Sequence, residues 1–180
     1  MLVVFGGSRS LSASFFPLVA QVVSASLARG FSLRVGCARG ADDLVVRAVS
    51  AADLLPRLAV FCAGAPPLSL SQSVLSSARV VPFAGGSAAV PIRARLALRS
   101  KRAVQGCSVA VFFLSLPALS GSLKAASFAA AEGCQVFAFS CGFSGAPAPL
   151  ADQAGAWLPS SLASCPCWRW QPAAVQPALF

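Results

Sequence analysis

Three glycine-containing turns hold the residues best suited to chemistry in this sequence. They are Gly6-Gly7-Ser8-Arg9, Gly36-Cys37-Ala38-Arg39-Gly40-Ala41-Asp42 and Ser120-Gly121-Ser122-Leu123. Each turn follows a short apolar run and precedes a stretch with a helical pattern. Glycines let a backbone approach an anion closely, and the N–H groups at a helix N-terminus attract negative charge. The three turns therefore predict a crevice that binds phosphate.

The predicted phosphate or nucleotide ligands are glycines, hydroxyls, two arginines and one carboxylate. They are Gly6, Gly7, Ser8, Arg9, Gly36, Arg39, Gly40, Asp42, Ser120, Gly121 and Ser122. A cation such as Arg39 at a helix start opposes the helix dipole, which favours an anion bound between them. Asp42 is also a common helix-start residue, so a purely structural role is the alternative for it.

A basic stretch at residues 91–105 has the spacing of a helix. At 100° per residue, Arg95, Arg99 and Arg102 fall within an arc of about 60°. We predict that these three residues, together with Lys124 in the first turn of a later helix, contact nucleic-acid phosphates. The alternative is a solvated helix face.

Catalytic and metal-binding groups are scarce. The chain has no His and five acidic residues, and Asp42 and Asp43 are neighbours that point apart on a helix. Without His or a paired C-x-x-C motif, no metal site and no cofactor are expected. The cysteines near strand ends are expected to be small buried hydrophobic residues; they are Cys37, Cys62, Cys107, Cys134 and Cys141. The sequence favours a binding site over a catalytic one.

The order of apolar runs and helical patterns predicts one α/β domain with a doubly wound, mostly parallel sheet. We place this domain at residues 1–142 and expect residues 143–180 to be an irregular tail that packs on it. Expected strands cover residues 2–5, 31–35, 57–62, 79–83, 108–114 and 135–140. Expected helices cover residues 12–29, 39–54, 71–78, 91–105 and 121–132.

Composition supports a polyanionic partner. Fourteen Lys and Arg oppose five Asp and Glu, which gives a net charge of +9. Although 57% of residues are hydrophobic, the longest uncharged stretches are interrupted by Pro and polar residues. We therefore expect no membrane association and a soluble, cytoplasmic protein.

Taken in order, the three turns and the Arg99-x-x-Arg102 pair resemble the SLOG superfamily of Rossmann-like domains, with the closest likeness to the central domain of the DNA-processing protein A family. Residues 120–139 are the most specific stretch, and the resemblance covers about residues 1–142. It implies a basic pocket for a nucleotide or DNA phosphate at the turns and at Arg99, and single-stranded DNA binding without catalysis. The Lonely-guy phosphoribohydrolases have similar turns but need a Glu just after the last one, where this chain has Lys124 and Ala125.

Three functions stay open on the sequence. The first is a module that binds single-stranded nucleic acid, and the second is a pocket for a small nucleotide-derived ligand. The third is a structural or interaction protein, whose tail residues Trp157, Trp168, Trp170 and Phe180 would cover a sheet edge or dock a second copy to form a homo-oligomer.

Overall fold

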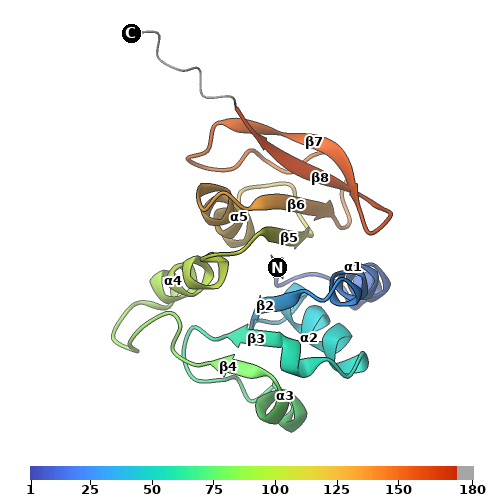
Figure 1. The fold of residues 1–180 in the computed structure, drawn as a ribbon. Coiled ribbons are helices and arrows are strands. Elements are labelled where there is room, and N and C mark those ends of the chain that lie inside the picture. Colours follow the sequence, from blue (N-terminus) through green and yellow to red (C-terminus); the bar gives the residue numbers. More distant parts are fainter. Residues whose placement is uncertain (174–180) are drawn as a thin grey trace.

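A computed structural model describes residues 1–173, which form one eight-stranded sheet with helices on both faces (Figure 1). The strands are β1 (Leu2–Gly7), β2 (Ser32–Gly36), β3 (Leu58–Phe61), β4 (Arg79–Val81), β5 (Val109–Leu114), β6 (Gln135–Ser140), β7 (Gly155–Leu162) and β8 (Cys165–Pro172). The helices are η1 (Ala13–Phe15), α1 (Phe16–Ala28), α2 (Ala41–Ala51), η2 (Leu55–Arg57), α3 (Gln72–Ser77), α4 (Ile92–Val104) and α5 (Gly121–Ala131). This is a Rossmann-like α/β domain, and the predicted fold class is confirmed.

The strand order is β4-β3-β2-β1-β5-β6-β8-β7. Strands β1 to β6 pair in parallel, and β8 pairs antiparallel with both β6 and β7. From β1 the chain first builds outward through β2, β3 and β4, and then returns to the other side of β1 to form β5. The winding direction therefore reverses between β1 and β5.

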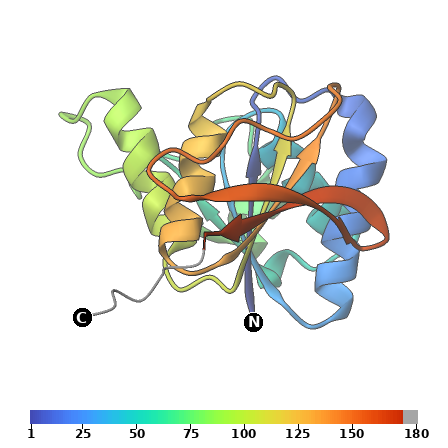
Figure 2. The same ribbon diagram turned by 90° about the horizontal axis from the view of Figure 1, so that it is seen from above.

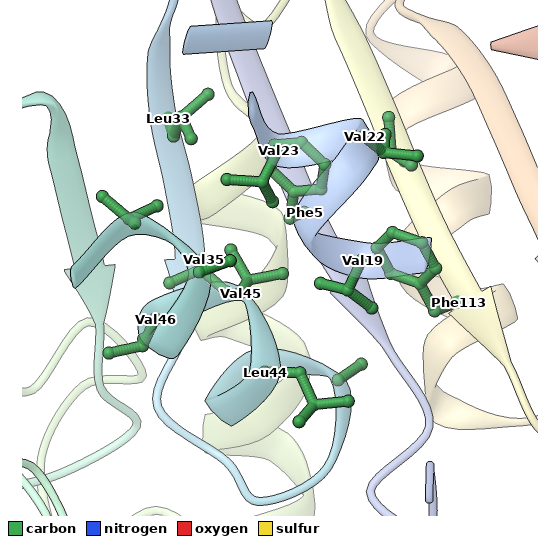
Figure 3. Packing of buried hydrophobic residues seen from close by; sticks show 14 of the residues in the cluster. Phe5, Val19, Val22, Val23, Leu33, Val35, Leu44, Val45, Val46 and Phe113 are labelled. Carbon is green, nitrogen blue, oxygen red and sulfur yellow. The ribbon is translucent and has the colours of Figure 1, made fainter. Parts of the chain in front are cut away.

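Alternating side chains of the central strands fill two cores. Val3 and Phe5 of β1 pack with α1 and α2, whereas Val4 packs on the side of α4 and α5. Figure 3 shows Phe5 beside Val23 and Phe113 beside Val19, both of which are valines of α1. The Phe113 ring stacks against Phe139 of β6, with centroids 5.2 Å apart. Because both faces of these strands are covered, the strands are continuous apolar runs.

A disulfide joins Cys107, in the turn after α4, to Cys134, in the turn after α5. The expectation that both are simple buried thiols is wrong. Each cysteine follows the end of a helix and precedes a strand, and β5 and β6 are adjacent. Two residues 27 positions apart are thereby brought together at the same end of the sheet.

The segment after residue 143 is not irregular throughout, which corrects the sequence-based expectation. Strands β7 and β8 form a hairpin that extends the sheet beyond β6 (Figures 1 and 2). Its two-residue loop, Ala163 and Ser164, has φ of 52° and 63°. Such loops normally contain Gly or Asn, so the sequence lacked the usual hairpin signal.

Two of the tail tryptophans are core residues of the hairpin. Trp157 and Trp170 pack edge to face with centroids 5.2 Å apart, and Trp157 Nε1 donates to the Ala148 carbonyl at 3.0 Å. Trp168 packs against the same core from a partly buried position. The tail thus covers the edge of β6, as expected under the hypothesis of a structural protein whose tail covers a sheet edge. Phe180 lies outside the described residues.

Among residues 1–173, no helix combines the length and the apolar character needed to cross a bilayer.

Candidate functional site

A cavity opens where the winding direction of the sheet reverses. It has a volume of about 700 Å³ and lies at the carboxyl ends of β1, β2 and β5, between α4 and the N-terminus of α5. In open α/β sheets, ligands bind outside the carboxyl ends of the strands at such a reversal. The order of the strands therefore creates this crevice, and the three turns predicted from the sequence meet in it.

The first two turns hold each other in place through backbone contacts. Ala41 N–H, at the end of the second turn, donates to the carbonyl of Ser8 in the first turn at 3.1 Å. Ser8 N–H in turn donates to the carbonyl of Phe113 in β5 at 2.9 Å, which ties the first turn to the sheet. Gly40 has φ of +77°, and a Cβ there would overlap the backbone oxygens of Ser8 and Arg9. Glycine at position 40 therefore lets the second turn lie directly against the first.

Ser8 also links the first turn to the end of β5. Its hydroxyl oxygen accepts the Ser115 N–H at 2.9 Å. This bond uses a lone pair and leaves the hydroxyl proton free to donate. Ser8 therefore has a structural role in fixing the pocket and can still offer a proton to an anion.

A buried ion pair forms one wall of the pocket. Arg99 Nη1 lies 3.2 Å from Asp42 Oδ2, and the two side chains are 14% and 7% exposed. Asp42 Oδ2 also accepts the Ala38 N–H at 3.1 Å. A Cβ at Gly36 would fall on both Arg99 Nη1 and Asp42 Oδ2, so glycine at position 36 makes room for the pair.

Burial raises the pKa of the Asp42 carboxyl above its ordinary value. The Arg99 guanidinium is the largest influence in the opposite direction, followed by the Ala38 N–H. Desolvation disfavours the carboxylate, whereas a nearby cation and an N–H donor favour it. Asp42 thus depends on Arg99 to carry its charge in this position.

The N-terminus of α5 forms the opposite wall. The Ser120 side chain caps the helix by accepting the Leu123 N–H at 3.3 Å. Gly121 and Ser122 occupy the first helical positions, whose N–H groups have no acceptor within the helix. These two N–H groups and the exposed Lys124 ammonium make this end of α5 attractive to an anion.

The pocket combines a cationic rim with an apolar floor. Its charged lining residues are five cations and one carboxylate: Arg9, Arg39, Arg93, Arg99, Lys124 and Asp42. Its apolar lining includes Leu96, Phe112, Ala125 and Phe128. Because Asp42 is already paired with Arg99, the other four cations have no carboxylate partner in the pocket.

Most of the predicted site residues meet in this pocket. The ones that line it are Gly6, Gly7, Ser8, Arg9, Gly36, Arg39, Asp42, Arg99, Ser120, Gly121, Ser122 and Lys124. Gly40 lies behind the first turn. Arg95 and Arg102 do not line the pocket, because Arg95 packs against Gly64 and Gly85 and Arg102 Nη1 donates to the Phe83 carbonyl at 3.5 Å.

The face of α4 that lines the pocket is not the face that the arginine spacing indicated. The lining residues of this helix are Arg93, Leu96, Ala97, Arg99, Ser100 and Val104. At 100° per residue, Arg93 lies about 120° around the helix from Arg99, outside the arginine arc. Sequence reasoning missed Arg93, and the signal that could have found it is the mixed apolar and small stripe on the same side of the helix.

Three serines that the sequence analysis did not single out also line the pocket: Ser10, Ser100 and Ser115. The Ser10 and Ser115 hydroxyls lie 2.8 Å apart. Within residues 1–173, no three His, Cys, Asp or Glu side chains are grouped closely enough to hold a metal ion.

No protein-family model matches the chain, and no curated protein matches its sequence. Two solved structures share its fold. DNA processing protein A from Helicobacter pylori, described for its single-stranded DNA binding mode, has a TM-score of 0.62 at 15% identity, over 77% of this chain and 64% of that one. DNA processing protein A (DprA) from Streptococcus pneumoniae has a TM-score of 0.61 at 19% identity, over 83% of this chain and 51% of that one. The chain spans less than two thirds of either protein, and at these identities the likeness establishes a shared fold, as the sequence resemblance implied.

Proposed function

We propose that this chain binds single-stranded nucleic acid by its phosphates, in the pocket at the carboxyl ends of β1, β2 and β5, without catalysing a reaction. The observation that carries the proposal is the charge of the pocket: five cations surround one carboxylate that Arg99 already neutralises. Four cations are thus left for a polyanion. The fold shared with DNA processing protein A of Helicobacter pylori, which is described as binding single-stranded DNA, supports the same choice of ligand.

Hydrogen-bond donors in the pocket add to the charge. The N–H groups at the start of α5 and the Ser8 hydroxyl proton can donate to phosphate oxygens. The Nε–H of Arg99 is buried and has no acceptor among residues 1–173, so a bound anion is one way of satisfying it. We assign Asp42 a structural role because its Oδ2 atom is occupied by Arg99 and by the Ala38 N–H.

The test is a fluorescence-polarisation titration of labelled oligo-dT at several salt concentrations. Neutralising four phosphates on a single strand gives a slope of log K against log salt of about −3. Arg93→Ala should weaken binding and make that slope less negative by about 0.7, the share of one phosphate. Arg102→Ala, outside the pocket, should change it less.

Arg29→Ala is the matched control. Arg29 is exposed and follows the C-terminus of α1, at the end of the sheet away from the pocket, so the variant loses the same charge at a different place. If Arg29→Ala and Arg93→Ala change the slope equally, the chain binds DNA through its overall charge and the pocket is not the site.

A small nucleotide-derived ligand is the second candidate, and the size and floor of the pocket favour it. A volume of about 700 Å³ lies within the range of about 300–1,000 Å³ for small-molecule sites. Phe112, Phe128 and Leu96 provide an apolar surface on which a base could rest. Competition with AMP and ADP-ribose separates the two functions: efficient displacement of the oligonucleotide by either compound supports the small ligand.

A further inference from the structure

Two cysteines lie side by side at the carboxyl ends of β2 and β3. Cys37 is the first residue after β2, and Cys62 is the first after β3. The two strands are parallel, with Gly36 opposite Phe61 in the register. One step further along both strands, Cys37 comes opposite Cys62.

The two side chains also share one face of the sheet. In each strand, the residue two positions before the cysteine, Val35 or Val60, belongs to the core on the α1 and α2 side. Cys62 is part of that same core, and Cys37 packs against it. Side chains at matching positions of parallel strands point the same way, so the two thiols face each other across the strands.

The backbone spacing suits a disulfide. Neighbouring strands lie about 4.8 Å apart, and disulfides bridge Cα atoms that are about 4.4–6.8 Å apart. Both cysteines are free thiols in the structure. Joining them requires little movement of the sheet.

The two thiols have unequal chemistry. A hydrogen bond from the Cys62 thiol is the largest influence that lowers the pKa of Cys37, to about 7, and the Arg99 guanidinium acts in the same direction. The hydrogen bond to Cys37 and burial raise the pKa of Cys62. Cys37 is also partly exposed, whereas Cys62 is fully buried. Cys37 therefore supplies the accessible thiolate, and Cys62 stays protonated beside it.

We propose that Cys37 and Cys62 form a reversible redox pair, which a peroxide converts to a disulfide at the base of the second glycine turn. The Cys37 thiolate attacks one peroxide oxygen, the O–O bond breaks, and the second oxygen leaves as water after taking up a proton, which gives Cys37 sulfenic acid. The Cys62 sulfur then attacks the Cys37 sulfur, and the sulfenic oxygen leaves as water with the Cys62 proton. Hydrogen peroxide gains two electrons and the two thiols lose them.

The proposal does not depend on which ligand the pocket binds. Cys37 lies between Gly36 and Ala38, both of which line the pocket, so the oxidation takes place in the second glycine turn. The Cys107–Cys134 disulfide is at the opposite ends of the strands and does not compete for these thiols.

The test is peptide mapping of the full chain after treatment with hydrogen peroxide. Trypsin releases Cys37 in the peptide 35–39 and Cys62 in the peptide 58–79, and neither peptide holds another cysteine. We expect these two peptides to be linked after oxidation, with the number of free thiols falling from five to three. Dithiothreitol should restore both thiols.

Two variants make the assignment specific. In Cys62→Ser the Cys37 sulfenic acid has no partner, so dimedone should label residue 37; in the oxidised wild type it should not. Cys141→Ser, which removes a buried thiol from the same core, should form the 37–62 link as the wild type does. The proposal is overturned if Cys37 and Cys62 are still free after peroxide treatment, or if either one is bonded to another cysteine. The peptide map of the wild type alone decides this if a variant does not fold.

Discussion

Replacing Arg99 with Ala removes the partner of a buried carboxylate, and the structure bounds the cost. Arg99 Nη1 and Asp42 Oδ2 are 3.2 Å apart, and the side chains are 14% and 7% exposed. Without the guanidinium, the carboxylate keeps the Ala38 N–H as its remaining donor. Removing one member of a buried ion pair typically costs about 3–5 kcal/mol.

Protonation of Asp42 sets an upper limit to that cost. An unfolded Asp has a pKa of about 3.9, so keeping the folded carboxyl protonated costs at most about 4 kcal/mol at pH 7 and about 1.5 kcal/mol at pH 5. The sign follows from the raised folded pKa of Asp42: the folded state holds the proton to higher pH than the unfolded state. Stability contributed by this group is therefore lost as the pH rises from the unfolded pKa to the folded pKa. The variant should lose stability over a wider pH window than the wild type, because it lacks the strongest influence that lowers this pKa.

Urea denaturation at pH 5 and pH 7 measures the effect. At pH 7 we expect Arg99→Ala to lose about 3 kcal/mol, which corresponds to a fall in Tm of about 6–12 °C for a chain of this size. The loss should be clearly smaller at pH 5. Adding Asp42→Asn to Arg99→Ala should recover most of the lost stability at pH 7, because the unpaired charge is then gone.

The refuting result is equally specific. If Arg99→Ala lost the same free energy at both pH values, and if Asp42→Asn recovered none of it, then the cost would come from lost packing of the arginine side chain. The ion pair would then not be the reason for the buried position of Asp42.

Three further predictions concern the turns and the sulfurs. Gly40→Ala should destabilise the fold by about 1–3 kcal/mol in urea denaturation, because position 40 has φ of +77° and lies against the backbone of Ser8. The control is Gly30→Ala, which also has a positive φ but lies in open space and therefore lacks the contact. Cys107→Ala should lower the free energy of unfolding by about 3.5 kcal/mol through loss of the disulfide that closes a 27-residue separation, and a stability equal to that of the wild type would show that the bond does not form in solution. The alkylation rate of Cys37 should rise with pH around a midpoint of about 7. Cys62→Ala should move this midpoint upward because it removes the hydrogen-bond donor, and an unchanged midpoint would contradict that contact.

The predicted elements of the parallel sheet agree with the structure because their signals are local. The run Val109–Leu114 is short, apolar and rich in β-branched and aromatic residues, which favours a buried strand. Ser120 is a helix cap that can be recognised from its sequence context. The glycine turns follow strands and precede helices, so their convergence at one end of a parallel sheet could also be predicted. The backbone part of the candidate site was thus available from the sequence.

The hairpin and the disulfide could not be predicted in this way. The hairpin loop uses Ala163 and Ser164 at positive φ, which gives no turn signal in the sequence. The packing of Trp157 on Trp170 is a contact between two strands that local sequence signals do not reveal. The cysteines of the disulfide are 27 positions apart, and their proximity depends on β5 lying beside β6.

What the sequence determined by itself, then, is which segments of residues 1–142 become strands and helices, where the three glycine turns occur, and that the chain is strongly basic. Only the tertiary structure decided which side chains meet. Arg95, Arg99 and Arg102 share one face of α4 by their spacing, but only Arg99 contacts Asp42. Arg93, from another face, lines the pocket, whereas Arg95 and Arg102 do not. The physical reason is that periodicity gives the angle of a residue around its helix axis, whereas the packing of the whole helix against the sheet determines what that angle points to.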